Sequence, residues 1–149
     1  MVSGGGVFIN GLFSIGRGCR ICIGHNGIIE FGDNFRCTGD TSIFCYKKVS
    51  FGDDCLLSWD VSIMDTDFHV IRNNQQGRIN YDSEIKVGNR VWIGCRTTIL
   101  KGVSIPSGSV IAAGSIISSS KAMTKDNAVY GGTGKDLVLL KDDILWTID

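Results

Sequence analysis

Two histidines are the side chains of this sequence best suited to move a proton near neutral pH. An imidazole with an unperturbed pKa of about 6.5 is mostly unprotonated at pH 7 and can accept a proton from a hydroxyl group. His69 ends the phrase Asp-Thr-Asp-Phe-His, so that Asp65, Asp67 or a backbone carbonyl is available to hold its second ring nitrogen. A loop histidine alone is more often inert than catalytic. The elements that place His69 therefore decide its role.

His25 belongs to a different pattern. It follows Cys19 and Cys22, which have the Cys-x-x-Cys interval of a zinc site, but a second pair of ligands at suitable spacing is missing. We therefore predict no metal site. The six cysteines otherwise follow no paired spacing and are expected to be small buried side chains without disulfides.

A strict six-residue repeat dominates the second half of the chain. An α-helix would rotate successive sixth residues by about 240° and scatter them around its axis, so the repeat excludes a helix. Val and Ile favour short strands, and regularly spaced glycines supply corners. The repeat predicts an all-β solenoid of short parallel strands in which the repeated residues point inward. These residues are Val87, Ile93, Ile99, Ile105, Ile111 and Ile117.

An irregular version of the repeat precedes this stretch. The phrases Phe-Gly-Asp-Asn, beginning at Phe31, and Phe-Gly-Asp-Asp, beginning at Phe51, lie twenty residues apart, which corresponds to one coil. Cys37, Ile43 and Val49 are expected to fill the intervening inward positions. The acidic residues are interpreted as corner residues, because Asp and Asn tolerate a left-handed backbone and bond to nearby amides.

The six-residue repeat stops after Ile63 and resumes at Ile85. The intervening loop, about residues 64–84, is polar and too long for an idle connection in a compact solenoid, which indicates a functional segment. His69 lies on this loop.

Composition narrows the range of functions. With 149 residues, 43% hydrophobic content and no compositional break, we predict a single domain over 1–149. Basic and acidic residues number fifteen each without a basic cluster, so neither nucleic acid nor an anionic membrane is an expected partner. No stretch approaches the ~20 apolar residues of a spanning helix, and no basic signal sequence begins the chain, so we predict no membrane insertion and a cytoplasmic location.

The segment VWIGCRTTILKGVSIPSGSVIAAGSII resembles the hexapeptide-repeat acyltransferases, in particular the sugar and polysaccharide O-acetyltransferases. The resemblance extends from about Val49 to about Leu140. It implies a left-handed parallel β-helix, a handedness that the periodicity does not predict. It also implies acetyl transfer from acetyl-CoA to a sugar hydroxyl, with His69 as the general base and corner N–H groups stabilising the oxyanion.

The same resemblance suggests further site residues. The family often has Asn in the coil before the histidine, where this chain has Asp60, which accepts hydrogen bonds but cannot donate like an amide. Asp60 and Asp67 are the candidate acceptor-binding residues. Beyond Ser118 the family's Gly-x-Pro-Ala phrase has lost its proline, although Lys135 stands where the family has a cation near the coenzyme A phosphates. The candidate coenzyme A-binding residues are Trp92, Cys95, Ala113, Ser118 and Lys135, with Lys121 and Lys125 as weaker candidates; Trp92 is equally well explained as a packing wedge between coils.

Family members are typically homotrimers with active sites between subunits, and the resemblance implies the same here. The C-terminal tail, about residues 119–149, contains the apolar stretch 137–146, which is expected to be buried and to cover an open end of the solenoid. A metal hydratase of this fold needs three histidines per site, and a trimer offers two; a purely structural solenoid leaves the long loop unexplained; an acetyltransferase for an amino acid or drug remains the main alternative.

Overall fold

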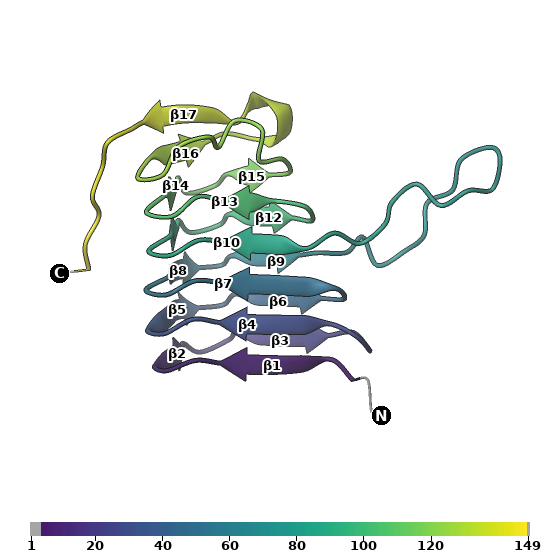
Figure 1. Cartoon of the computed structure of the whole chain (residues 1–149), viewed down its shortest axis with the longest axis horizontal. Helices are drawn as coiled ribbons and strands as arrows, with labels where there is room; N and C mark the ends of the chain where they lie inside the picture. Colours follow the sequence, from purple (N-terminus) through teal and green to yellow (C-terminus); the bar gives the residue numbers. More distant parts are fainter. Residues whose placement is uncertain (1–3, 149) are drawn as a thin grey trace.

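The computed structural model describes residues 4–148 and shows a three-sided solenoid (Figure 1). Each coil adds one strand to each of three parallel sheets, which we call sheets A, B and C. Followed from the N-terminus, the chain crosses the near side of Figure 1 leftward and returns rightward behind while it rises, which is a left-handed turn. The predicted left-handed parallel β-helix is thus confirmed, and the described residues contain no α-helix.

The sheets contain five, seven and five strands. Sheet A consists of β1 (Gly6–Ile9), β4 (Ile28–Phe31), β7 (Lys48–Phe51), β10 (Ile85–Val87) and β13 (Ser104–Ile105). Sheet B consists of β2 (Phe13–Ile15), β5 (Phe35–Gly39), β8 (Leu56–Trp59), β11 (Trp92–Ile93), β14 (Val110–Ile111), β16 (Val129–Gly131) and β17 (Val138–Lys141). Sheet C consists of β3 (Arg20–Ile23), β6 (Ser42–Cys45), β9 (Ser62–Met64), β12 (Thr98–Leu100) and β15 (Ile116–Ile117).

The repeated Val and Ile residues fill the interior. All six positions predicted to point inward are at most 4% exposed, and Cys37, Ile43 and Val49 are buried with them. Parallel pairing stacks like on like: Ile43, Ile63, Ile99 and Ile117 form one column through sheet C. Because these β-branched side chains suit extended backbone and lose their water contact together, the repeat defines strand register and core at once.

The acidic corner residues form a ladder along the edge between sheets A and B. The Asp33 carboxylate accepts from the Leu12 N–H, Asp53 accepts from the Asp33 N–H, and Asn89 accepts from the Asp53 N–H, at 2.8 to 2.9 Å. At the neighbouring corner position the backbone is left-handed, with φ of 57° at Asp54. This confirms the corner interpretation of the Gly-Asp-Asn and Gly-Asp-Asp phrases, since each side chain satisfies an amide of the adjacent coil.

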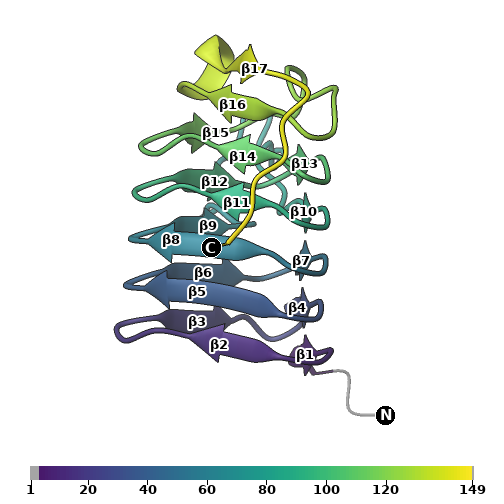
Figure 2. The same ribbon diagram turned by 90° about the vertical axis from the view of Figure 1, so that its left-hand side faces the viewer.

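The C-terminal tail only partly covers the end of the solenoid. After the short 3-10 helix Gly134–Asp136, β17 pairs antiparallel with β16 and so protects that edge. Residues 142–148 then leave the end and run back down the side of sheet B (Figure 2). Leu137 is buried, but the expected burial of the rest of the apolar stretch is not found within one chain, because all of β17 is exposed. We call residues 142–148 the strap.

Candidate active site

The three sheets meet at three edges, and the candidate residues divide among them. Corners between sheets A and B form the A–B edge, those between B and C the B–C edge, and those between C and A the C–A edge. Residues 65–84 connect β9 to β10 at the C–A edge and extend far from the solenoid (Figure 1). We call this segment the arm; it matches the loop predicted at about 64–84.

The arm is a narrow ribbon whose two branches bond to each other. Arg72 and Arg78 form an antiparallel bridge, and the Ile79 N–H donates to the Ile71 carbonyl at 2.9 Å. Five of its large apolar side chains are between 46% and 67% exposed, namely Phe68, Val70, Ile71, Ile79 and Tyr81. An apolar surface of this kind on a projecting segment is typical of a contact with another molecule.

Asp65 fixes the root of the arm. Its carboxylate is fully buried and accepts hydrogen bonds from the N–H groups of Tyr46 and Lys47 in the coil below, at 2.7 and 2.8 Å. Burial of the Cys45 thiol, together with the nearby charge of Asp65, raises its pKa to about 12. Asp65 is thus committed to the corner and does not contact the imidazole of His69.

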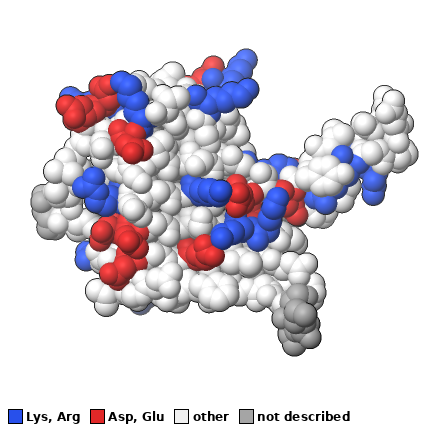
Figure 3. Space-filling model, in the orientation of Figure 1, with Lys and Arg blue, Asp and Glu red and all other residues white. Residues whose placement is uncertain are grey.

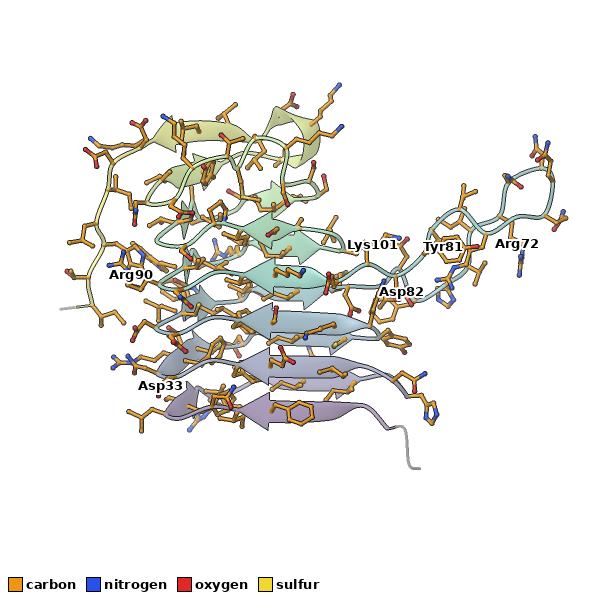
Figure 4. All side chains as sticks on the ribbon, viewed as in Figure 1. Asp33, Arg72, Tyr81, Asp82, Arg90 and Lys101 are labelled. Atoms are coloured by element: carbon orange, nitrogen blue, oxygen red, sulfur yellow. The ribbon has the colours of Figure 1, made fainter. Side chains whose placement is uncertain are left out.

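Two side chains hold Asp67, one from the solenoid and one from the returning branch of the arm. Lys101, on the next C–A corner, forms an ion pair with its carboxylate, and the Asn80 amide donates to the same carboxylate at 2.9 Å. The bond from Lys101 is the main reason that the pKa of Asp67 lies below its usual value, and Asn80 adds to the effect. These contacts join the outgoing branch of the arm to its returning branch and to the solenoid; Lys101 and Asp82 mark the place in Figure 4, and charges of both signs gather there in Figure 3.

His69 lies just beyond this junction. Its backbone N–H donates to the Asp67 carbonyl at 2.7 Å, and its backbone carbonyl accepts from Asn80 Nδ2 at 2.8 Å. The side chain is exposed, and within residues 4–148 the imidazole has no hydrogen-bond partner. The backbone of His69 is therefore fixed while both ring nitrogens are open to a substrate or a second chain.

A cavity of about 290 Å³ lies higher on the same edge, beyond β15. Ser118, Lys121 and Lys135 line it together, so two of the predicted coenzyme A residues meet there and Lys121 joins them. Within the described chain neither ammonium group forms an ion pair, whereas Lys125 is paired with Asp142 at 2.5 Å. Two unpaired ammonium groups beside a small cavity suit phosphate groups.

The remaining predicted residues lie elsewhere. Cys95 and Ala113 occupy successive B–C corners, where the Gly114 N–H donates to the Cys95 carbonyl at 2.9 Å. Asp60 lies on the same edge with a left-handed φ of 59° and approaches Arg96 at 4.0 Å. The chain by itself therefore does not bring Asp60, Cys95 or Ala113 to His69. These three residues lie on the B–C edge, where the strands of sheet C begin, and His69 lies on the C–A edge, where they end.

Trp92 occupies the outer face of sheet B. Its indole N–H donates to Ser58 Oγ at 3.0 Å, and its ring packs against Trp146 of the strap with centroids 6.0 Å apart. Trp92 is 37% exposed, so one chain leaves part of its ring accessible. Both interpretations of this residue, as a packing wedge and as a binding residue, stay compatible with its position.

Asn80 and Lys101 are candidate site residues that the sequence did not reveal. Asn80 is 8% exposed although it belongs to a polar loop, and its side-chain Oδ1 also accepts from the Ile71 N–H at 2.6 Å. Neither residue stands in a recognisable motif. Only their long-range contacts identify them.

The structure offers no evident metal centre: across residues 4–148, no group of three or more His, Cys, Asp or Glu side chains is arranged to hold an ion. Cys19 turns inward, with its sulfur 3.6 Å from that of Cys37, while Cys22 is exposed on sheet C. Over the same range, no helix is long and apolar enough to cross a membrane.

Comparison with known proteins finds the same architecture in solved structures of acetyltransferases. The structure of the polysialic acid O-acetyltransferase OatWY matches with a TM-score of 0.69 and 24% identity, over 98% of this chain and 90% of that one. A maltose O-acetyltransferase from Clostridium difficile 630 also gives a TM-score of 0.69, at 24% identity, over 91% of this chain and 70% of the other. The resemblance inferred from the six-residue repeat is thus confirmed at the level of the fold.

Two further comparisons give higher sequence identities. A galactoside acetyltransferase in complex with coenzyme A is 25% identical, with a TM-score of 0.67, over 91% of this chain and 64% of that one. The polysialic acid O-acetyltransferase of Neisseria meningitidis is 38% identical over 55 residues, which is 36% of this chain. That match spans 26% of the relative's length. No family model matches the chain.

Proposed function

We propose that this protein transfers an acetyl group from acetyl-CoA to a hydroxyl group of a sugar or polysaccharide, with His69 as the general base. The observation that carries the proposal is the C–A edge itself. It presents a histidine with open ring nitrogens on a pinned backbone and, further along, a cavity with two unpaired ammonium groups. The relatives that share the fold include acetyltransferases named for polysialic acid, maltose and galactoside acceptors.

The proposed reaction needs one base and one set of oxyanion donors. The His69 imidazole takes the proton of the acceptor hydroxyl as its oxygen attacks the thioester carbonyl. Corner N–H groups stabilise the resulting oxyanion. The tetrahedral intermediate then collapses with loss of the coenzyme A thiolate, which takes the proton back from the imidazolium. The products are the acetyl ester and the free thiol, and the enzyme is returned unchanged.

The acyl donor would extend between the two groups of candidate residues. Lys135 and Lys121 suit its phosphates, and Ser118 lies beside them. Cys95, Ala113 and Trp92 would contact the donor from another chain.

A homotrimer would unite these groups. If three prisms associate around a threefold axis, the C–A edge of one chain faces the B–C edge of the next, in a head-to-tail contact that closes into a ring. His69 and Asp67 of one chain would then meet Asp60, Cys95 and Ala113 of its neighbour. The exposed apolar side chains of the arm support this arrangement, because a neighbouring chain would cover them. Since the reaction consumes acetyl-CoA, we place the protein in the cytoplasm.

A direct assay tests the activity. The purified full chain is incubated with acetyl-CoA and a panel of saccharides, amino acids and drugs, and products are detected by mass spectrometry. We expect a mass increase of one acetyl group on a saccharide, together with release of free thiol. Acetylation of only an amino acid or drug would transfer the assignment to the alternative acceptor class, and absence of both product and thiol release would refute the acetyltransferase proposal.

A further inference from the structure

A second cleft lies on the A–B edge, away from the arm. It has a volume of about 430 Å³ and is bounded by the solenoid corner on one side and by the strap on the other. A volume of this size suits a small ligand or one or two units of a polymer. Its residues on the solenoid side are Asn34, Arg36, Asp54 and Arg90; Arg90 is labelled in Figure 4.

Hydrogen bonds between side chains organise the solenoid wall of this cleft. Asn34 Nδ2 donates to the Asp54 carboxylate at 2.7 Å, and Asn34 Oδ1 accepts from Arg36 Nε at 3.2 Å. The Asp54 carboxylate, the Asn34 amide and the Arg36 guanidinium thus lie side by side in a fixed order. Throughout the described chain neither Arg36 nor Arg90 forms an ion pair, so both guanidinium groups keep donors for a ligand.

The strap supplies an aromatic and apolar wall. Trp146 is held by its indole N–H, which donates to the Arg90 carbonyl at 2.8 Å, and by its packing on Trp92. The Ile144 N–H donates to the Asn127 carbonyl at 2.9 Å and fixes the strap above. Leu145 and Ile148 also line the cleft and are exposed.

We propose that this cleft is a saccharide-binding site separate from the catalytic edge, in which a pyranose ring lies against Trp146 and its hydroxyl groups bond to Asp54, Asn34 and Arg36. A sugar presents hydroxyl groups that both donate and accept, and a C–H face that packs on an aromatic ring. The alternation of carboxylate, amide and guanidinium beside an indole matches both needs. A purely anionic ligand fits less well, because Asp54 lies within the cleft and the Asp33 and Asp53 corners adjoin it.

The site deepens the proposed function and rests on it in one respect: its biological ligand would be another unit of the acceptor polysaccharide. A polymer held on the A–B edge has a raised effective concentration at the catalytic edge, without any new contact to the reacting unit. The site therefore predicts a preference for long acceptors over single sugars.

The Trp146 indole N–H provides a direct readout, because it bonds within the cleft wall. The full chain, labelled with nitrogen-15, is titrated with maltohexaose and with a hexamer of sialic acid, and the three indole signals are followed by NMR. A Trp146→Phe variant assigns the signal. We expect a saturable shift of the Trp146 signal with at least one of these probes; a shift with either supports the site and shows whether a carboxylate is tolerated.

Matched variants separate this site from the catalytic one. Arg36→Ala should weaken binding at least about tenfold, since a hydrogen bond to a charged group is worth roughly 1.5–3 kcal/mol. Arg20→Ala, at an equally exposed strand position on sheet C, should leave binding unchanged, and so should His69→Ala. Failure of both probes to shift Trp146, or equal binding by wild type and Arg36→Ala, would overturn the proposal. Because the readout requires no turnover, loss of the acetyltransferase assignment would not affect it.

Discussion

Asp65 and Asp67 lie two residues apart and carry the same side chain, yet their surroundings give them different tasks. Asp65 is buried and satisfies two backbone amides of the coil below, so it belongs to the scaffold. Asp67 is partly exposed and ties the arm to Lys101. The orientation of His69 thus depends on its backbone contacts and not on a carboxylate bonded to its ring.

His69→Ala should abolish acetyl transfer and leave the fold intact. The side chain is exposed and has no hydrogen-bond partner within the described chain, so its removal should disturb the fold little, while general-base catalysis is worth about 10²–10⁴-fold. The loss should appear in kcat and not in the KM for acetyl-CoA, as steady-state kinetics would show. His25→Ala serves as the control and should retain activity. If His69→Ala keeps more than about a tenth of the wild-type kcat, the mechanism is wrong.

Lys101→Met should raise the pKa of Asp67 toward its ordinary value. In the folded protein this pKa is lowered, chiefly by Lys101, so the ion pair stabilises the arm above the ordinary Asp pKa of about 3.9 and is lost as the pH falls through the lowered value. NMR titration of the Asp67 carboxyl carbon measures the change. Lys121→Met, one coil further on, is the matched control; an unchanged Asp67 titration in Lys101→Met would show that the ion pair does not form in solution.

At the scale of elements, the arm is stabilised by few contacts for its length. The Asn80 side chain makes three hydrogen bonds, to Asp67, His69 and Ile71, and is the main link between the two branches near the histidine. This gives Asn80 a positioning role for His69 without contact to the reacting groups.

Asn80→Ala should loosen the arm and lower kcat without changing the KM for acetyl-CoA. Each lost hydrogen bond is worth about 0.5–1.5 kcal/mol of local stability, so amide exchange in residues 69–80 should accelerate at least about tenfold. Hydrogen-exchange mass spectrometry measures this. Asn74→Ala, at the exposed tip, is the control; protection equal to wild type in Asn80→Ala would remove the positioning role.

The cavity beyond β15 gives a second prediction at this scale. Lys135→Glu should weaken binding of acetyl-CoA more than binding of a truncated pantetheine thioester, because only acetyl-CoA carries the phosphates that the ammonium group attracts. Calorimetric titration of both ligands makes the comparison. Lys141→Glu, on the exposed strand β17, should change neither affinity. Equal losses for both ligands in Lys135→Glu would exclude Lys135 from the phosphate site.

The elements differ in how far the sequence predicts them. The six-residue repeat specifies the coil, the strand register and the inward face, because a period of six leaves one consistent arrangement of β-branched residues. All six repeated positions from Val87 to Ile117 are buried as predicted. The arm's limits follow from where the repeat stops. Its internal bonds do not, because Asn80 and Lys101 act through contacts between distant residues. The course of the strap was also missed, since an apolar segment indicates burial but not the surface that provides it.

At the scale of the whole molecule, the candidate residues lie on two edges, and the proposed active site would need a second chain to unite them. We expect a trimer by sedimentation velocity at micromolar concentration. Val70→Asp would place a charge on the exposed apolar surface of the arm and should dissociate the trimer while the β-type circular dichroism signal stays unchanged. A wild-type monomer with full activity would contradict the shared-site arrangement.

The constant register of the upper coils has a consequence for how this molecule can change in length during evolution. Val87 pairs with Ile105, Ile93 with Ile111 and Ile99 with Ile117, so the two coils superpose at one offset of eighteen residues. Insertion or deletion of a segment of that size would preserve every inward position and add or remove one coil. A change that is not a multiple of six residues would turn apolar residues toward water. Changes of length within these coils are therefore expected in multiples of six residues, with eighteen residues preserving the sheet of every strand as well, and other sizes are expected in the arm, which leaves the stack at one corner.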